Sequence, residues 1–199
     1  MKSILKTKKS IALLFSLALL LFVSVGGTLA YLIDTTQPVG NTFTSSKVTT
    51  AVVETLDGQT KKNVSIQNTG DTTAYIRAAV VVNWKDVDGN VYGQVPVAGT
   101  DYTITYALGN GWKQGADGFY YYIRPVQSVA EAPSDCSTQV LINSCSPVAD
   151  RAPSGYYLNM EILCSGIQSQ PEKVVTELWS EGVSGVSMVD DVPTLTIKE

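Results

Sequence analysis

The segment AYIRAAVVVNW, residues 74–84, is the strongest strand signal in the chain and decides its fold class. In the first half of the segment the side chains alternate between two faces, with Ile76 and Ala78 on one of them. The second half contains three consecutive valines, residues 80–82, which predict a strand that is buried on both faces.

Further strand signals separated by turns lie on both sides of this segment. The turn sequences Asn-Thr-Gly-Asp at 68–71 and Asp-Gly-Asn at 88–90 bound it directly. Valine, threonine, isoleucine and tyrosine, which pack well on a pleated surface, are frequent in the flanking segments. Strands are expected at residues 43–56, 62–67, 101–108, 119–123 (with a possible extension past Pro125 over 126–129), 138–142 and 156–167. Many short strands with regular turns predict an all-β fold, an antiparallel β-sandwich or jelly roll.

One short helix is expected near the C-terminus. Residues 169–172, Ser-Gln-Pro-Glu, match a capping box with proline in the first turn, and Gly182 is placed to end the helix. Between them, one helical stripe carries apolar side chains, namely Val174, Val175, Leu178 and Trp179. The tail that follows, residues 183–199, contains VPTLTI, which predicts an additional edge strand.

The N-terminus has the three parts of a secretion signal. Four lysines precede a fifteen-residue apolar run at 11–25, and small residues follow, with Thr28 and Ala30 at the positions that a signal peptidase reads. The run is shorter than the roughly 20 residues that a spanning helix needs. We therefore predict an N-terminal signal helix within a signal peptide, residues 1–30, that is cleaved before Tyr31. An uncleaved anchor is the alternative, and it would be the chain's only association with a membrane.

The expected mature chain, residues 31–199, has the size of a single domain. It holds ten basic against 18 acidic residues, a net charge of −8, which argues against nucleic acid as a partner. The chain has no histidine, which excludes Ser-His-Asp and Cys-His catalysis and the HExxH zinc site. Because no paired carboxylates, P-loop or GxSxG motif is present either, we predict no catalytic residue, no cofactor and no enzymatic activity.

Three cysteines, an odd number, allow one disulfide and one free thiol. Cys136 and Cys145 lie in the stretch 131–154, which we expect to be an irregular loop. A disulfide between them could cross-link this loop. Cys164 lies in an apolar run and is expected to be a buried thiol. Three cysteines without a CxxC pair do not make a zinc site, so no metal is predicted.

Two further features have a functional and a structural interpretation. The sequence Lys-Asp-Val-Asp-Gly-Asn at 85–90 resembles a calcium loop, but its glycine is misplaced, and a hairpin turn is the favoured interpretation. The aromatic side chains of Trp112, Tyr120 and Tyr122 form a possible binding surface for glycan or protein. Packing inside the sandwich is the favoured interpretation of these aromatics.

Cleavage after Ala30 would create a new apolar N-terminus, Tyr31-Leu32-Ile33-Asp34. A frayed tail beside the cleavage site is one interpretation. The other is that residues 31–40 form a donor strand that completes the sheet of another subunit through main-chain hydrogen bonds.

The stretch GGTLAYLIDTTQPVGNTFTSSKV, residues 26–48, resembles the start of TasA/camelysin-family precursors, which carry a signal cut by a SipW-type peptidase. The stretches IQNTGDTTAYIRAAVVVNW, 66–84, and GWKQGADGFYYYIRPV, 111–126, are similar to the core strands of that family. The resemblance implies a jelly-roll or Ig-like sandwich, secretion, and fibre subunits of a biofilm matrix that donate an N-terminal strand, which here would begin at Tyr31. Camelysins are described as metalloproteases, an activity that we do not expect in a chain without histidine.

Two functions follow as expectations. The first is a secreted structural protein of the cell surface or biofilm matrix, whose partners are the signal peptidase during export and then other copies of itself. The alternative is a monomeric surface module that binds through exposed aromatics.

Overall fold

The computed structural model describes residues 47–199. The expected signal peptide 1–30 and its helix, the first residues of the expected strand 43–56, and the possible donor segment 31–40 lie outside the described residues. The individual residues concerned are Thr28, Ala30, Tyr31, Leu32, Ile33 and Asp34.

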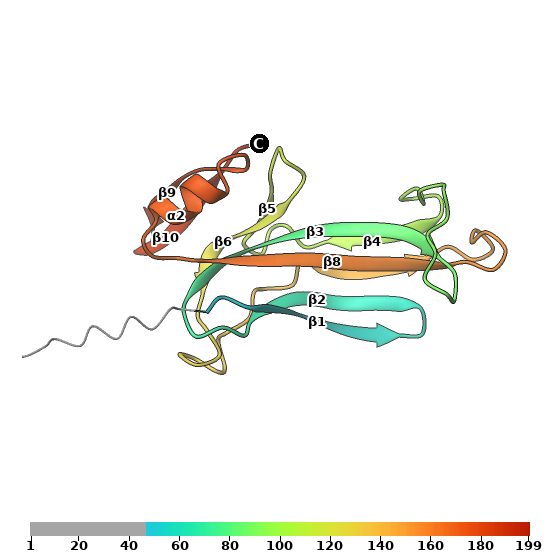
Figure 1. Ribbon diagram of the computed structural model, residues 1–199, viewed down its shortest axis with the longest axis horizontal. Coiled ribbons are helices and arrows are strands. Elements are labelled where there is room, and N and C mark those ends of the chain that lie inside the picture. Colours follow the sequence, from blue (N-terminus) through green and yellow to red (C-terminus); the bar gives the residue numbers. More distant parts are fainter. Residues whose placement is uncertain (1–46) are drawn as a thin grey trace, which may run out of the picture. The chain divides into compact units, whose positions relative to one another are not determined.

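Two four-stranded antiparallel sheets contain eight of the ten strands of the described residues, so the all-β prediction is confirmed (Figure 1). The first sheet has the order β1 (Thr50–Asp57), β2 (Thr60–Asn68), β7 (Ile142–Pro147), β4 (Tyr102–Tyr106). The second has the order β5 (Trp112–Gln114), β6 (Tyr120–Val126), β3 (Ala74–Lys85), β8 (Tyr157–Gln168). The strand predicted at residues 74–84 is β3, and it pairs along its whole length with β8.

A hydrophobic cluster with members from both sheets forms the main core. Val64 and Ile66 of β2 are fully buried, as the alternation in residues 62–67 predicts. From the other sheet, β3 contributes Ile76 and Ala78, and β8 contributes Met160. The inner face of β3 is therefore the one that its sequence alternation identifies.

A second cluster covers the outer face of β3 and β6 near one end. It is built by helix α2 (Lys173–Leu178) and the antiparallel hairpin of β9 (Val183–Val189) and β10 (Val192–Ile197). The tail thus forms two strands rather than the one expected. Tyr75 and Tyr121 lie under Val175 and Trp179 of this cover, and all four side chains are buried.

The helix is shorter than expected, and the predicted capping box does not form. Glu172 occupies the N-cap position without a side-chain hydrogen bond, and Ser169 Oγ donates instead to the Thr73 carbonyl oxygen. Leu178, expected on the buried stripe, is exposed. The reason is geometric, because a helix of six residues turns only one narrow stripe toward the sheet.

The stretch 131–154 is not an irregular loop throughout. It contains β7, which lies inside the first sheet between β2 and β4. The strand was expected at residues 138–142, but it begins only at Ile142. Before it, Thr138 and Leu141 form single hydrogen bonds to the backbone of β2, and the regular ladder starts after them.

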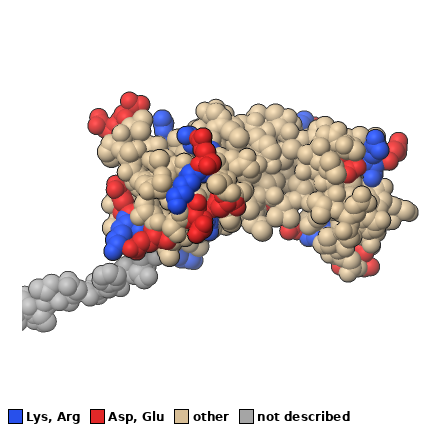
Figure 2. Space-filling view, turned by 90° about the horizontal axis from the view of Figure 1, so that it is seen from above, with Lys and Arg blue, Asp and Glu red and all other residues tan. Residues whose placement is uncertain are grey.

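Charged side chains are unevenly distributed over the surface. Figure 2 shows them in two groups toward opposite ends of one face, with a band between that carries few of them. Among residues 47–199 no helix is long and apolar enough to cross a membrane.

Candidate functional site

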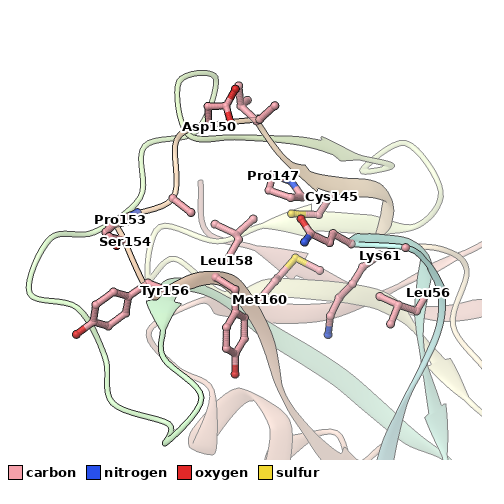
Figure 3. Close-up of a pocket in the computed structure, with 17 residues that line it drawn as sticks. Leu56, Lys61, Cys145, Pro147, Asp150, Pro153, Ser154, Tyr156, Leu158 and Met160 are labelled. Carbon is pink, nitrogen blue, oxygen red and sulfur yellow. The ribbon is translucent and has the colours of Figure 1, made fainter.

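A groove of about 760 Å³ lies at one end of the two sheets (Figure 3). Its walls are β1 and β2 on one side, the start of β8 on the other, and the loop between β7 and β8 at the end. β1 and β8 are each the last strand of their sheet, so each has one edge without a strand partner in the described chain. The groove therefore runs between two free strand edges.

The groove exists because the two edges diverge along their length. At the end away from the groove, β1 and β8 are in contact, and Thr50 Oγ1 donates a hydrogen bond to Cys164 Sγ over 3.2 Å. A Cβ atom on Gly166 would lie 2.6 Å from Val48 Cγ1, so only glycine allows this close approach. At the other end of the same strands, Leu56 of β1 and Leu158 of β8 are separated by the open groove.

A β-bulge turns a lysine toward the groove. In the pairing of β1 with β2, Val53 lies opposite Ser65 but Thr55 lies opposite Lys62, so β2 has one extra residue there. Asn63 provides it with a left-handed backbone, φ 54°, which asparagine tolerates better than most residues. Beyond the bulge the side chains change face, and Lys61 comes to lie opposite the buried Cys145.

Lys61 is held by an ion pair at the groove. Its Nζ lies 2.8 Å from Glu54 Oε1 and 3.1 Å from Glu54 Oε2. Burial raises the pKa of the neighbouring Cys145 thiol, although the charge of Lys61 opposes that shift. The thiol is therefore protonated at neutral pH and acts as part of an apolar floor rather than as a nucleophile.

The groove wall formed by the start of β8 is mostly apolar. Met160 is buried at the base of the groove, and Leu158 lies beside it (Figure 3). Toward the rim, Leu56 is 66% exposed and Tyr157 is 46% exposed. A groove with partly apolar walls, two free backbone edges, one lysine and one aspartate is suited to an extended peptide that pairs with a strand edge and places alternate side chains inward.

The loop at residues 85–90 is a turn, as predicted. Both oxygens of the Asp86 carboxylate accept hydrogen bonds inside the turn, from the backbone of Asp88 and from the backbone and side chain of Asn90. Across residues 47–199 no three cysteine or acidic side chains come together in the manner of a metal site.

The predicted binding aromatics do not form a surface. Trp112, Tyr120 and Tyr122 are 1%, 8% and 9% exposed, and all three belong to the core between the sheets. Trp112 packs against Tyr122 with ring centroids 5.3 Å apart, and its Nε1 donates to the Gln139 carbonyl oxygen over 2.8 Å. The favoured interpretation, packing inside the sandwich, is confirmed, and the alternative of an exposed platform is not. Trp112, Tyr120 and Tyr122 lie between the sheets, while α2 and the β9–β10 hairpin cover the other face of β6.

The cysteines are not placed for a disulfide. Cys145 lies opposite Lys61 on β2, whereas the carbonyl of Cys136 accepts from the Asn68 N–H at the other end of the same strand. Seven residues of strand correspond to about 23 Å, several times the Cα separation that a disulfide bridges. The Cys136–Cys145 disulfide, which the sequence left open, is therefore not formed, and all three cysteines are free. Cys164 is half-buried rather than buried.

Sequence reasoning missed the groove itself. Its walls come from three segments that are far apart in the chain, and no pattern within residues 50–62 or 157–160 indicates that the edges diverge. The available signal was Asn63, a residue with poor strand propensity in the middle of an alternating segment.

Searches for similar proteins found none. No family model matches the chain, and neither the curated proteins nor the solved structures contain a significant match.

Proposed function

We propose that this protein is a secreted, non-enzymatic structural subunit of a surface fibre or biofilm matrix, assembling when one copy donates its N-terminal segment to the groove of the next. The proposal includes the finer classification expected from the sequence. That classification is a jelly-roll or Ig-like sandwich of the TasA/camelysin type, exported by a signal peptide cut before Tyr31.

The observation that carries the proposal is the groove between the free edges of β1 and β8. Unpaired strand edges readily pair with other chains, so proteins usually cover them. Here two of them flank a partly apolar space whose lining includes Leu158 and Met160. An inserted strand would bond to an edge and bury the exposed Leu56 side chain at the same time.

The direction of the chain supports a head-to-tail arrangement. The first described residues join the domain at the end opposite the groove, where the Lys47 and Thr49 carbonyl oxygens accept from Asp71 and Thr69. β1 then runs eight residues, about 26 Å, toward the groove. A donor at one end and an acceptor at the other give a heterologous contact that does not close on itself, which is the geometry of a filament.

The proposed donor has suitable length and chemistry. Cleavage before Tyr31 would leave sixteen residues ahead of Lys47, about 53 Å when fully extended. That length is sufficient for a strand of five or six residues and a tether. Tyr31, Leu32 and Ile33 would provide the apolar side chains that the groove walls match.

The test compares four purified proteins by negative-stain electron microscopy: residues 31–199, residues 39–199, and two variants of 31–199. The first variant, Leu56→Arg with Tyr157→Arg, puts charge on the groove rim at exposed positions where the fold tolerates it. The second, Leu178→Arg, is a matched control, because Leu178 is 69% exposed on α2, outside the groove.

We expect filaments from residues 31–199 and from the Leu178→Arg control, and discrete particles from the truncated and groove-rim proteins. Filaments from residues 39–199 would refute strand donation. Discrete particles from all four proteins at high concentration would refute the fibre function altogether.

A further inference from the structure

The loop between β3 and β4 carries an exposed apolar surface that the proposed function does not use. Five of its side chains are exposed, namely Val87 (90%), Val91 (56%), Tyr92 (39%), Val95 (71%) and Val97 (55%). We refer to these five side chains as the valine face. Isolated exposed apolar residues are ordinary, but five within eleven positions of one loop are a concentration of the kind that marks a contact site.

The valine face is held in place by its own hydrogen bonds. The Asp86 carboxylate fixes the first turn through the backbone N–H groups of Asp88 and Asn90. The Tyr92 N–H donates to the Trp84 carbonyl oxygen over 2.9 Å, and the Val97 N–H donates to Asp101 Oδ2 over 2.8 Å. A contact surface that is already ordered loses less conformational entropy when a partner binds.

The valine face is continuous with the groove. Tyr92 packs against Tyr156 with ring centroids 4.9 Å apart and ring planes tilted by 55°, and Tyr156 itself lines the groove. A segment that fills the groove therefore brings the rest of its own subunit against the end of the molecule where the valine face lies.

The uncharged stretch of the loop allows contact with another acidic protein, including a second copy. Residues 47–199 hold ten basic and 17 acidic side chains, so two copies repel each other over most of their surfaces. Residues 89–100 of the loop contain no charged side chain. Two copies can meet along residues 89–100 without bringing like charges together, whereas Val87 lies between Asp86 and Asp88.

We infer that the valine face is a second contact between successive copies of this chain, docking against the body of the subunit whose N-terminal segment occupies the groove. This inference rests on the proposed strand donation. The occupant is a second copy rather than a lipid surface, because the loop is bounded by Asp86, Asp88 and Asp101 and offers no basic side chain to anionic headgroups.

The test uses charge insertion in the chain of residues 31–199. Val87→Asp with Val95→Asp changes the valine face, and Met188→Asp with Val189→Asp adds the same charge at exposed positions of the β9–β10 hairpin. The critical concentration for filaments, measured by pelleting, should rise about tenfold or more for the first pair and less than about twofold for the second. In parallel, a labelled peptide of residues 31–46 is titrated into residues 39–199 with and without the valine-face changes, and fluorescence anisotropy is read.

The inference predicts equal peptide binding by the two truncated proteins together with impaired filaments in the valine-face variant. Equal critical concentrations for the two variant pairs would overturn the inference while leaving strand donation intact. Absence of peptide binding to the parent truncated protein would overturn the strand-donation function, and this inference with it. Vesicles of anionic lipid added to the parent protein should not co-sediment with it, and valine-dependent co-sedimentation would also overturn the inference.

Discussion

Replacement of Asn68 by alanine should be one of the most destabilising single changes in the described chain. Asn68 is fully buried at the end of β2, where the chain turns toward β3. Its Nδ2 donates to the carbonyl oxygens of Thr72 and Val126, at 2.9 and 3.0 Å, and its Oδ1 accepts from the Gly70 N–H at 3.1 Å. One side chain thereby connects the turn to the end of β6.

The magnitude follows from what alanine leaves behind. Three hydrogen bonds are lost, and at least two of the abandoned partners, the Val126 carbonyl and the Gly70 N–H, are buried. Each unsatisfied buried group costs about 1–3 kcal/mol. Part of this penalty is relieved when water enters the space of the missing amide, so we expect a total loss of about 3–5 kcal/mol in the free energy of unfolding.

Urea unfolding followed by tryptophan fluorescence measures this loss, because Trp84, Trp112 and Trp179 are all buried. Asn110→Ala is the matched control, since Asn110 is an exposed turn residue and its replacement should change stability by less than about 0.5 kcal/mol. A loss below about 1 kcal/mol for Asn68→Ala, with an unchanged m-value, would refute the assignment of this side chain as a buried structural connector.

Three further predictions concern stability and the cysteines. Hydrogen bonds lower the pKa of Glu131 below its usual 4.5, so its contribution to stability is complete above that pH and is lost as the pH falls through the lowered value. Glu131→Gln should therefore lower stability at neutral pH and make the fall in stability below about pH 4.5 shallower, as urea titrations at several pH values will show. Gly182→Ala should cost about 1–3 kcal/mol, because the new Cβ would lie 2.3 Å from the hydroxyl oxygen of the buried Tyr121, and a change in melting temperature below 1 °C would contradict this. Cys136 and Cys145 should react with a thiol reagent only after unfolding, and a disulfide between them in the mass of the unreduced protein would show the strand register to be wrong.

Strands with clear alternation could be predicted from the sequence, because burial of one face requires a period of two. Val64 and Ile66, and Ile76 and Ala78, face the core as their spacing indicates. The position of β7 could not be predicted in this way, because its sequence INSCSP has little alternation and its place is set by pairing with β2 and β4 on either side.

The candidate site was less predictable than the strands. Whether Tyr121 is exposed depends on residues that follow it by more than fifty positions, since the α2–β9–β10 cover buries its face of β6. The groove depends on the divergence of two strand edges and on the left-handed backbone of Asn63. Both are tertiary features that local propensity does not encode.

Complementation between two defective subunits tests strand donation most directly. Residues 39–199 keep the groove but lack the proposed donor, whereas the Leu56→Arg, Tyr157→Arg variant of residues 31–199 keeps the donor but has a blocked groove. Each should sediment as a monomer alone, and an equimolar mixture should form a dimer that cannot grow, because only one donor and one open groove are present. Filaments or dimers from either protein alone, or a mixture that stays monomeric while residues 31–199 assemble, would contradict the account.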